Sequence, residues 1–127
     1  MLNTDILTAA GIDAEEGMAY CAEDPEFYEE MLLEFVSEAA SRPEAMDRLL
    51  SAADWTGYGL HAHTLKSTAR MIGALAFSER ARAMELAARA GDRDAIRSDH
   101  AAFAAEYAAL VAAIREASEQ ERGMTHA

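Results

Sequence analysis

Residues 59–74, GLHAHTLKSTARMIGA, hold two of the four histidines in the chain, His61 and His63. Two histidines one residue apart can share a metal ion, act as a catalytic pair, or have unrelated roles. If the stretch is helical, each residue turns the chain by about 100°, so the two rings point in nearly opposite directions. Metal binding by two histidines of one helix needs spacing of three or four residues instead. A shared metal ion is therefore excluded.

Helical phasing places His63 on a polar face and His61 on the apolar side, about 160° away. Near His63, within about 60°, lie four residues of small or cationic type: Lys66, Ser67, Arg70 and Ala74. We expect His61 to be a packed or boundary histidine, hydrogen-bonded inside the bundle. The cations beside His63 disfavour its protonated ring and so favour the neutral, nucleophilic form. They would also stabilise an attached phosphoryl group, although a merely solvated polar face is the alternative at this point.

The composition indicates one all-α domain. The chain has 127 residues, of which 51% are hydrophobic, with seven glycines and two prolines. Its formal net charge of −12 disfavours binding to nucleic acids and to anionic membranes. The single cysteine excludes an internal disulfide, and no apolar stretch approaches the roughly 18 residues of a membrane span. Without a signal-peptide pattern, the expected location is cytoplasmic.

The helices that position His63 are predicted from apolar residues at three- and four-residue spacing. In chain order we expect one or two short pieces broken at Gly11, a long helix from Asp24 kinked or broken at Pro43, a helix from Asp54 to about Ile72, one ending at Gly91, and a last one from Asp92 past Ile114. These elements predict a single domain over residues 1–127, folded as an antiparallel four-helix bundle with short N-terminal helical segments. The core spans residues 11–118, and the polar tail is expected to be frayed.

The segment AHTLKSTARMIGA resembles the signature of histidine-containing phosphotransfer (HPt) domains. That signature is a helical His-x-x-Lys, then a small residue, and a glycine ten positions after the histidine; here these are His63, Lys66, Ser67 and Gly73. The stretches DPEFYEEMLLEF, LLSAADW and ERARAMELAARAGD resemble the helices that flank the signature. The resemblance covers nearly the whole chain, from about Gly11 to about Ser118.

The resemblance implies a four-helix bundle whose exposed histidine accepts a phosphoryl group from an aspartyl phosphate and passes it to another aspartate. His63 would then be the phosphorylated nucleophile, Lys66 would neutralise the phosphoryl oxygens, and Gly73 would allow close packing near the helix end. The family usually has glycine where this chain has Ser67, whose hydroxyl can donate a hydrogen bond to a phosphoryl oxygen. The resemblance places the divalent metal in the receiver partner, so this chain is expected to have no cofactor and no metal site.

The implied partners are response-regulator receiver domains or a hybrid sensor histidine kinase. Within the helix of His63 we expect four residues to form the docking surface: Thr64, Arg70, Met71 and Ala74. The chain has no ATP-binding loop, so it is expected to be a phosphocarrier without autokinase activity, and a monomer. An adaptor that docks or sequesters receiver domains without phosphotransfer is the alternative. The acidic residues are interpreted as solvated helix faces, and His100 and His126 as surface or tail residues.

Overall fold

The computed structural model describes the backbone of residues 2–126 and the side chains of residues 2–118. Over that range it contains seven helices and no strand: α1 (Thr4–Ala9), α2 (Ala14–Tyr20), α3 (Pro25–Glu38), α4 (Arg42–Ser51), α5 (Trp55–Met71), α6 (Leu75–Arg89) and α7 (Arg93–His126). The all-helical prediction is confirmed. Within the described residues, no helix has both the length and the apolar character that a membrane crossing requires.

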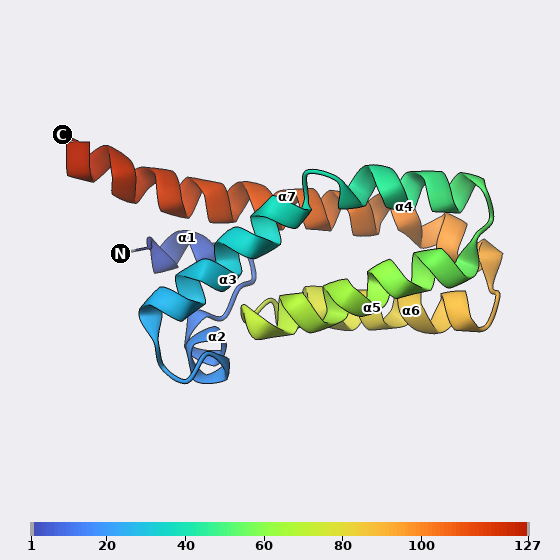
Figure 1. Ribbon diagram of the computed structural model, residues 1–127, viewed down its shortest axis with the longest axis horizontal. Helices are drawn as coiled ribbons and strands as arrows, with labels where there is room; N and C mark the ends of the chain where they lie inside the picture. Colours follow the sequence, from blue (N-terminus) through green and yellow to red (C-terminus); the bar gives the residue numbers. More distant parts are fainter. Residues whose placement is uncertain (1, 127) are drawn as a thin grey trace.

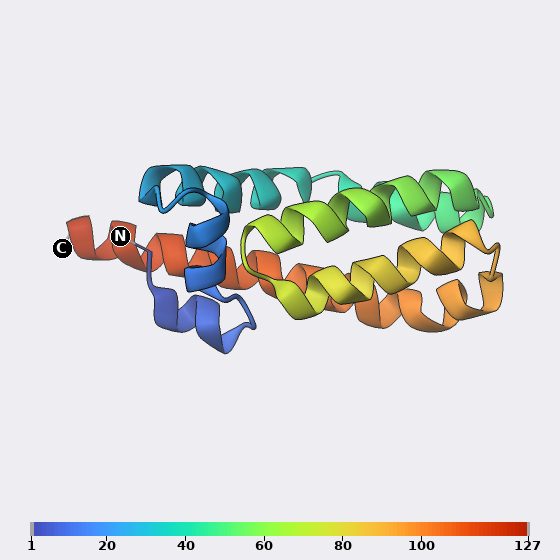
Figure 2. The same ribbon diagram turned by 90° about the horizontal axis from the view of Figure 1, so that it is seen from below.

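The hairpin of α5 and α6 forms the largest helix–helix contact of the molecule (Figure 1). The two helices run antiparallel, and α7 packs against α6 and continues past the end of the hairpin (Figure 2). α3 contacts α5 and α7, while α4 contacts α5 and α1 contacts α7. The large, fully buried side chains come from several of these helices and include Tyr58, Phe35, Phe103, Leu32, Leu65 and Ile114. The His63 helix is thus held on several sides by packed neighbours.

Local chemistry explains where the helices begin and break. The Asp54 carboxylate accepts a hydrogen bond from the backbone N–H of Gly57 at 3.0 Å and so caps the start of α5. The long helix expected across Pro43 is two helices, since α3 ends at Glu38 and α4 begins at Arg42. Proline is compatible with a first helical turn but has no N–H with which to continue a preceding helix. At the other end of the chain, α7 continues as a helix to His126, where the sequence predicts a frayed tail.

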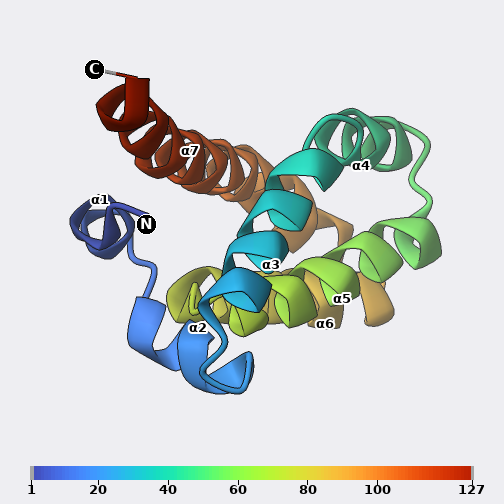
Figure 3. The ribbon, with the colours of Figure 1, turned by 60° about the vertical axis from the view of Figure 1, so that its left-hand side comes forward.

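The N-terminal segment packs against the C-terminal end of α5 (Figure 3). Gly73 follows α5 with a φ of +89°, and its carbonyl oxygen accepts a hydrogen bond from the backbone N–H of Asp13 at 2.9 Å. The Tyr28 hydroxyl donates to the carbonyl oxygen of Ile72 at 2.8 Å. Carbonyls at a helix end have no partner within the helix, so these bonds satisfy groups that burial would otherwise leave unpaired. Residues before α3 and early in α3 therefore fix the end of α5.

Charge is unevenly divided along the chain. Residues 1–54, which include α1 to α4, carry fourteen acidic and two basic side chains. Residues 55–91, which form the α5–α6 hairpin, carry five basic and two acidic side chains. The hairpin that carries His63 is thus net positive in a strongly acidic protein.

Candidate functional site

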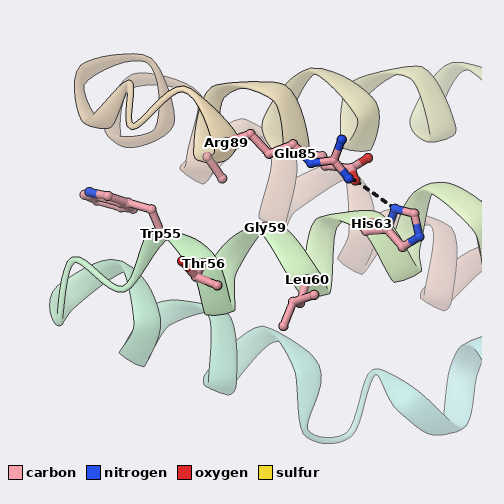
Figure 4. A pocket seen from close by; sticks show the side chains of 8 residues that line it. Trp55, Thr56, Gly59, Leu60, His63, Glu85 and Arg89 are labelled. Atoms are coloured by element: carbon pink, nitrogen blue, oxygen red, sulfur yellow. Dashed lines mark hydrogen bonds and ion pairs between the residues drawn. The ribbon is translucent and has the colours of Figure 1, made fainter.

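Glu85 of α6 is a buried carboxylate that binds three side chains around His63. Its Oε2 lies 2.7 Å from Nδ1 of His63, and its Oε1 accepts a hydrogen bond from Nζ of Lys66, also at 2.7 Å. Nη2 of Arg89 donates to Oε2 at 2.8 Å. Only 3% of the Glu85 side chain is exposed, against 51% of the His63 side chain. Figure 4 shows His63 reaching Glu85 from the neighbouring helix while the rest of its ring faces outward.

The electrostatics of Glu85 determine which nitrogen of His63 carries hydrogen. Burial alone would raise the pKa of Glu85, but hydrogen bonds from Lys66 and His63 and the charges of Lys66 and Arg89 lower it below its ordinary value. Glu85 is therefore ionised, and an ionised carboxylate only accepts hydrogen bonds. Nδ1 of His63 must be the donor. In the neutral ring, Nε2 then keeps its lone pair and is the nucleophilic atom.

Close approach of α5 and α6 brings these side chains together. Gly59 of α5 faces Ala88 of α6 so closely that a Cβ at Gly59 would lie 3.2 Å from the Ala88 Cβ. About two helical turns before Glu85 on α6, the buried Ser78 hydroxyl donates to the carbonyl oxygen of Lys66 at 2.7 Å. Small residues at one contact and a hydrogen bond at another thus fix the hairpin on either side of Glu85. The carboxylate is rigidly placed, as an orienting group requires.

The resulting site offers an exposed imidazole nucleophile with two cations beside it. Lys66 and Arg89 keep 30% and 68% of their side chains exposed while they bind Glu85. Both can therefore reach a negatively charged group that approaches His63. Among the described residues, no three side chains of the His, Cys, Asp or Glu type are grouped so that they could hold a metal ion. The arrangement suits nucleophilic attack on a phosphoryl group, which needs positioning and charge neutralisation.

Four other residues of the signature helix lie along the exposed side of α5. Ser67 is exposed, one turn after His63, and its hydroxyl makes no hydrogen bond to any side chain or backbone group that the structure describes. The Thr64 hydroxyl donates to the carbonyl oxygen of Leu60 at 3.1 Å. Arg70 is exposed and Met71 is half-buried. The Ser67 hydroxyl is thus available to a ligand.

Ala74 does not lie on this surface, contrary to the expectation from helical phasing. It is 1% exposed and occupies the N-cap of α6. Because α5 ends at Met71 and Gly73 turns the chain with a positive φ, the helical phase does not extend to Ala74. Gly73 itself contacts Asp13 and Gly17, so the close packing at this glycine is with the N-terminal segment.

His61 faces α4, away from His63, as the phasing predicts. Its Nδ1 lies 2.8 Å from Nη1 of Arg42, whose other terminal nitrogen donates to Glu38 at 2.8 Å. Arginine is always a donor, so Nδ1 of His61 accepts and the ring is neutral. Burial, and then the charge of Arg42, hold the pKa of His61 below its ordinary value. His61 has a structural role in joining α5 to the α3–α4 turn.

This shift predicts a loss of stability in mild acid that depends on His61. Because the folded protein disfavours protonation of His61, the unfolded chain takes up the proton first as the pH falls through about 6.5. The contribution of His61 to the free energy of unfolding is therefore complete above about pH 6.5 and declines as the pH falls toward the lower pKa of His61 in the folded state. Urea unfolding midpoints at about pH 7.5 and about pH 5.5 should differ more in the wild-type chain than in His61→Gln. Equal differences would contradict this role.

His100 is not a surface residue, so that prediction is wrong. It is 9% exposed, with Nδ1 2.7 Å from the Tyr58 hydroxyl and Nε2 2.8 Å from Oδ1 of Asp47. Burial, and then the charge of Asp47, raise the pKa of Tyr58, so its hydroxyl keeps its proton and donates to Nδ1. Nε2 then donates to Asp47. This chain of bonds joins α4, α5 and α7. The side chain of His126 lies outside those that the structure describes.

Glu85 and Arg89 are candidate site residues that the sequence analysis does not identify, since it interprets the acidic residues as solvated and does not single out Arg89. A signal was present in the apolar stripe of α6. Glu85 follows Ala81 by four residues and precedes Ala88 by three, and both alanines are buried. A carboxylate in such a stripe must be paired, because burying an unpaired charge is costly. The pairing partner is the neighbouring helix that carries His63.

Comparison with known families adds one finding. The family model described as the Hpt domain matches residues 30–117, from within α3 to within α7, and so includes His63, Lys66, Glu85 and Arg89. The matched range excludes α1 and α2. No match was found among curated proteins or among solved structures.

Proposed function

Because the chain belongs to the Hpt domain family, whose members act in phosphotransfer in phosphorelays, we propose that His63 is its phosphoryl carrier. In this proposal His63 accepts the group from the aspartyl phosphate of one receiver domain and passes it to the aspartate of another. The observation that carries the proposal is the bond from Nδ1 of His63 to buried Glu85, which leaves an exposed Nε2 as nucleophile. Helices α3–α4, α5, α6 and α7 then serve as the four members of a cytoplasmic phosphotransfer bundle.

The transfer step requires no proton movement. The Nε2 lone pair of His63 attacks the phosphorus, so the N–P bond forms as the bond from phosphorus to the aspartyl oxygen breaks, and the partner's carboxylate leaves with the electron pair. The phosphorylated ring keeps its hydrogen on Nδ1 and gains a positive charge. The Glu85 carboxylate, already bonded to Nδ1 at 2.7 Å, stabilises that charge. The reverse step toward a second receiver uses the same atoms.

Lys66 and Arg89 neutralise the phosphoryl oxygens in this scheme. Both are bonded to Glu85 before transfer, and both are partly exposed. When the ring becomes positive, His63 itself balances the carboxylate, and the two cations can turn to the phosphoryl group. The free hydroxyl of Ser67, one turn after His63, adds a donor where the family usually has none. The receiver docks over Thr64, Arg70 and Met71.

Transfer between two purified receiver domains tests the proposal. The wild-type chain is mixed with a receiver domain phosphorylated on its aspartate, and the label on the chain is followed with time. We expect a phosphate that is lost in acid and stable in base, as a phosphoramidate is. Addition of a second, unphosphorylated receiver should then remove it. Binding of the receiver without any label on the chain would contradict the proposal and favour an adaptor.

Glu85→Gln is expected to slow transfer by roughly ten- to a hundredfold, the effect of losing a hydrogen bond to a charged group. Glutamine has the same shape but no charge, so it neither orients Nδ1–H as strongly nor stabilises the positive phosphorylated ring. Because Glu85 acts through His63, the maximal rate should fall while the receiver concentration giving half that rate stays unchanged. Single-turnover transfer over a range of receiver concentrations measures both quantities.

Glu79→Gln is the matched control, because Glu79 lies on the same helix and its side chain is 68% exposed. Its only described ion pair is with Arg82 at 3.8 Å. This variant should transfer at the wild-type rate. An equal fall of the maximal rate in both variants would contradict the positioning role of Glu85. A Glu85→Gln variant that changes only the receiver concentration giving half the maximal rate would contradict it as well.

A further inference from the structure

A hollow of about 470 Å³ opens between α5 and α6 directly beside His63. It is lined by Trp55, Thr56, Gly59, Leu60, His63, Glu85, Ala88 and Arg89 (Figure 4). Gly59, which has no side chain, and Ala88, which has one methyl group, are both lining residues, so neither projects a large side chain into the hollow. His63 lies toward one end of this groove and Trp55 toward the other. The volume is within the roughly 300–1,000 Å³ range of ligand pockets.

The groove combines an apolar wall with a cationic rim. Leu60 lies one turn before His63 and is 66% exposed, the most exposed of the large hydrophobic side chains that the structure describes. Trp55 is half-buried, and the Arg97 guanidinium lies 5.9 Å from the centre of its ring. Arg89, with 68% of its side chain exposed, closes the α6 side. A partner segment that carries an apolar side chain next to an acidic group would complement both the apolar wall and the cationic rim.

We propose that this groove receives an apolar side chain of the receiver domain, from a segment next to its phosphorylatable aspartate, and that Leu60 is a specificity-determining residue for transfer. The inference rests on the proposed function. It adds a docking region between α5 and α6 that adjoins the surface of Thr64, Arg70 and Met71 at Leu60, whose carbonyl oxygen accepts the Thr64 hydroxyl.

Continuity with the transfer site identifies the occupant. His63 is itself a wall of the groove, and attack requires Nε2 to approach phosphorus to roughly 3–3.5 Å. A receiver domain that brings its aspartyl phosphate this close must also cover the adjoining end of the groove. Its acidic centre then faces Lys66 and Arg89, so the charges are complementary. Burial of Leu60 against the partner's apolar side chain follows from the same placement.

Leu60→Ala tests this inference with two phosphoryl donors. The first donor is the phosphorylated receiver domain that labels the wild-type chain fastest, and the second is phosphoramidate, which is too small to fill the groove. We expect the kcat/KM for the receiver to fall about tenfold, as removal of a leucine side chain from a buried contact predicts. Labelling of His63 by phosphoramidate should remain at the wild-type rate. A second variant, Thr56→Trp, fills the groove while leaving Leu60 in place. It should also show slower transfer from the receiver and unchanged labelling by phosphoramidate.

Leu86→Ala is the matched control, because Leu86 is also exposed, at 50%, but does not line the groove. It should transfer from the receiver within twofold of the wild-type chain. Wild-type rates of transfer from the receiver in Leu60→Ala and Thr56→Trp would overturn the groove as a docking site. An equal loss of transfer in Leu86→Ala would do the same. Either result would leave His63 as the phosphoryl carrier. Failure of either donor to label the wild-type chain would instead overturn the proposed function.

Discussion

His63→Gln is expected to abolish labelling of the chain by a phosphorylated receiver domain. A glutamine amide has no nucleophilic lone pair on nitrogen, so no N–P bond can form. The substitution should leave the fold intact, because half of the His63 side chain is exposed and the glutamine NH₂ can still donate to Glu85. Quantitative transfer assays, with circular dichroism and urea unfolding of the same preparation, measure the two effects separately.

His61→Gln is the paired control for this experiment. It changes the other histidine of the same helix, whose ring is bonded to Arg42 and faces away from the site. We expect it to accept the phosphoryl group at nearly the wild-type rate. Phosphoryl label that persists in His63→Gln would contradict His63 as the phosphorylated residue. Loss of the label in His61→Gln at unchanged stability would contradict it as well.

Gly73→Ala is expected to destabilise the protein by about 3 kcal/mol or more. Two causes act together. The φ of Gly73 is +89°, which a residue with a Cβ adopts only with strain. The added Cβ would also collide with the backbone carbonyl of Asp13, and backbone on both sides leaves little room to relax. The free energy of unfolding, from urea titration, measures the effect.

Gly91→Ala separates these two causes. Gly91 also has a positive φ, of +66°, but a Cβ there would meet no atom within 4 Å. It should cost only about 1 kcal/mol, the backbone contribution alone. Equal losses in the two variants would show that the contact between Gly73 and the N-terminal segment contributes nothing. A larger loss in Gly73→Ala would show that the residues before α3 stabilise the end of the His63 helix.

Sequence patterns predict those structural features that depend on a single helix, such as its ends and the directions of its side chains. The spacing of apolar residues indicates α5 with nearly correct ends and separates the directions of His61 and His63, because both follow from helical geometry. The prediction for Ala74 failed where that geometry stops, at Gly73. The helix end expected at about Ile72 was nearly correct, so the error lay in carrying the helical phase past that end to Ala74.

Features that depend on two or three helices were not predictable in this way. Glu85 reaches His63 only because α5 and α6 pair in one particular register, which no periodicity within either helix specifies. The bonds of His100 to Tyr58 and Asp47 likewise require α4, α5 and α7 to be placed together. Polar residues within an apolar stripe indicate that a partner is needed, yet they do not identify that partner.

The division of charge between α1–α4 and the α5–α6 hairpin gives the molecule an electric dipole as well as a net charge. An acidic partner is repelled by the protein as a whole, but the field near the hairpin is favourable and turns the exposed imidazole toward the approaching phosphate. More collisions then begin in a productive orientation. This influence extends over about one Debye length, roughly 8 Å at physiological ionic strength, so it acts in the last step before contact. A protein of large negative charge can thus select the direction from which an anionic partner arrives.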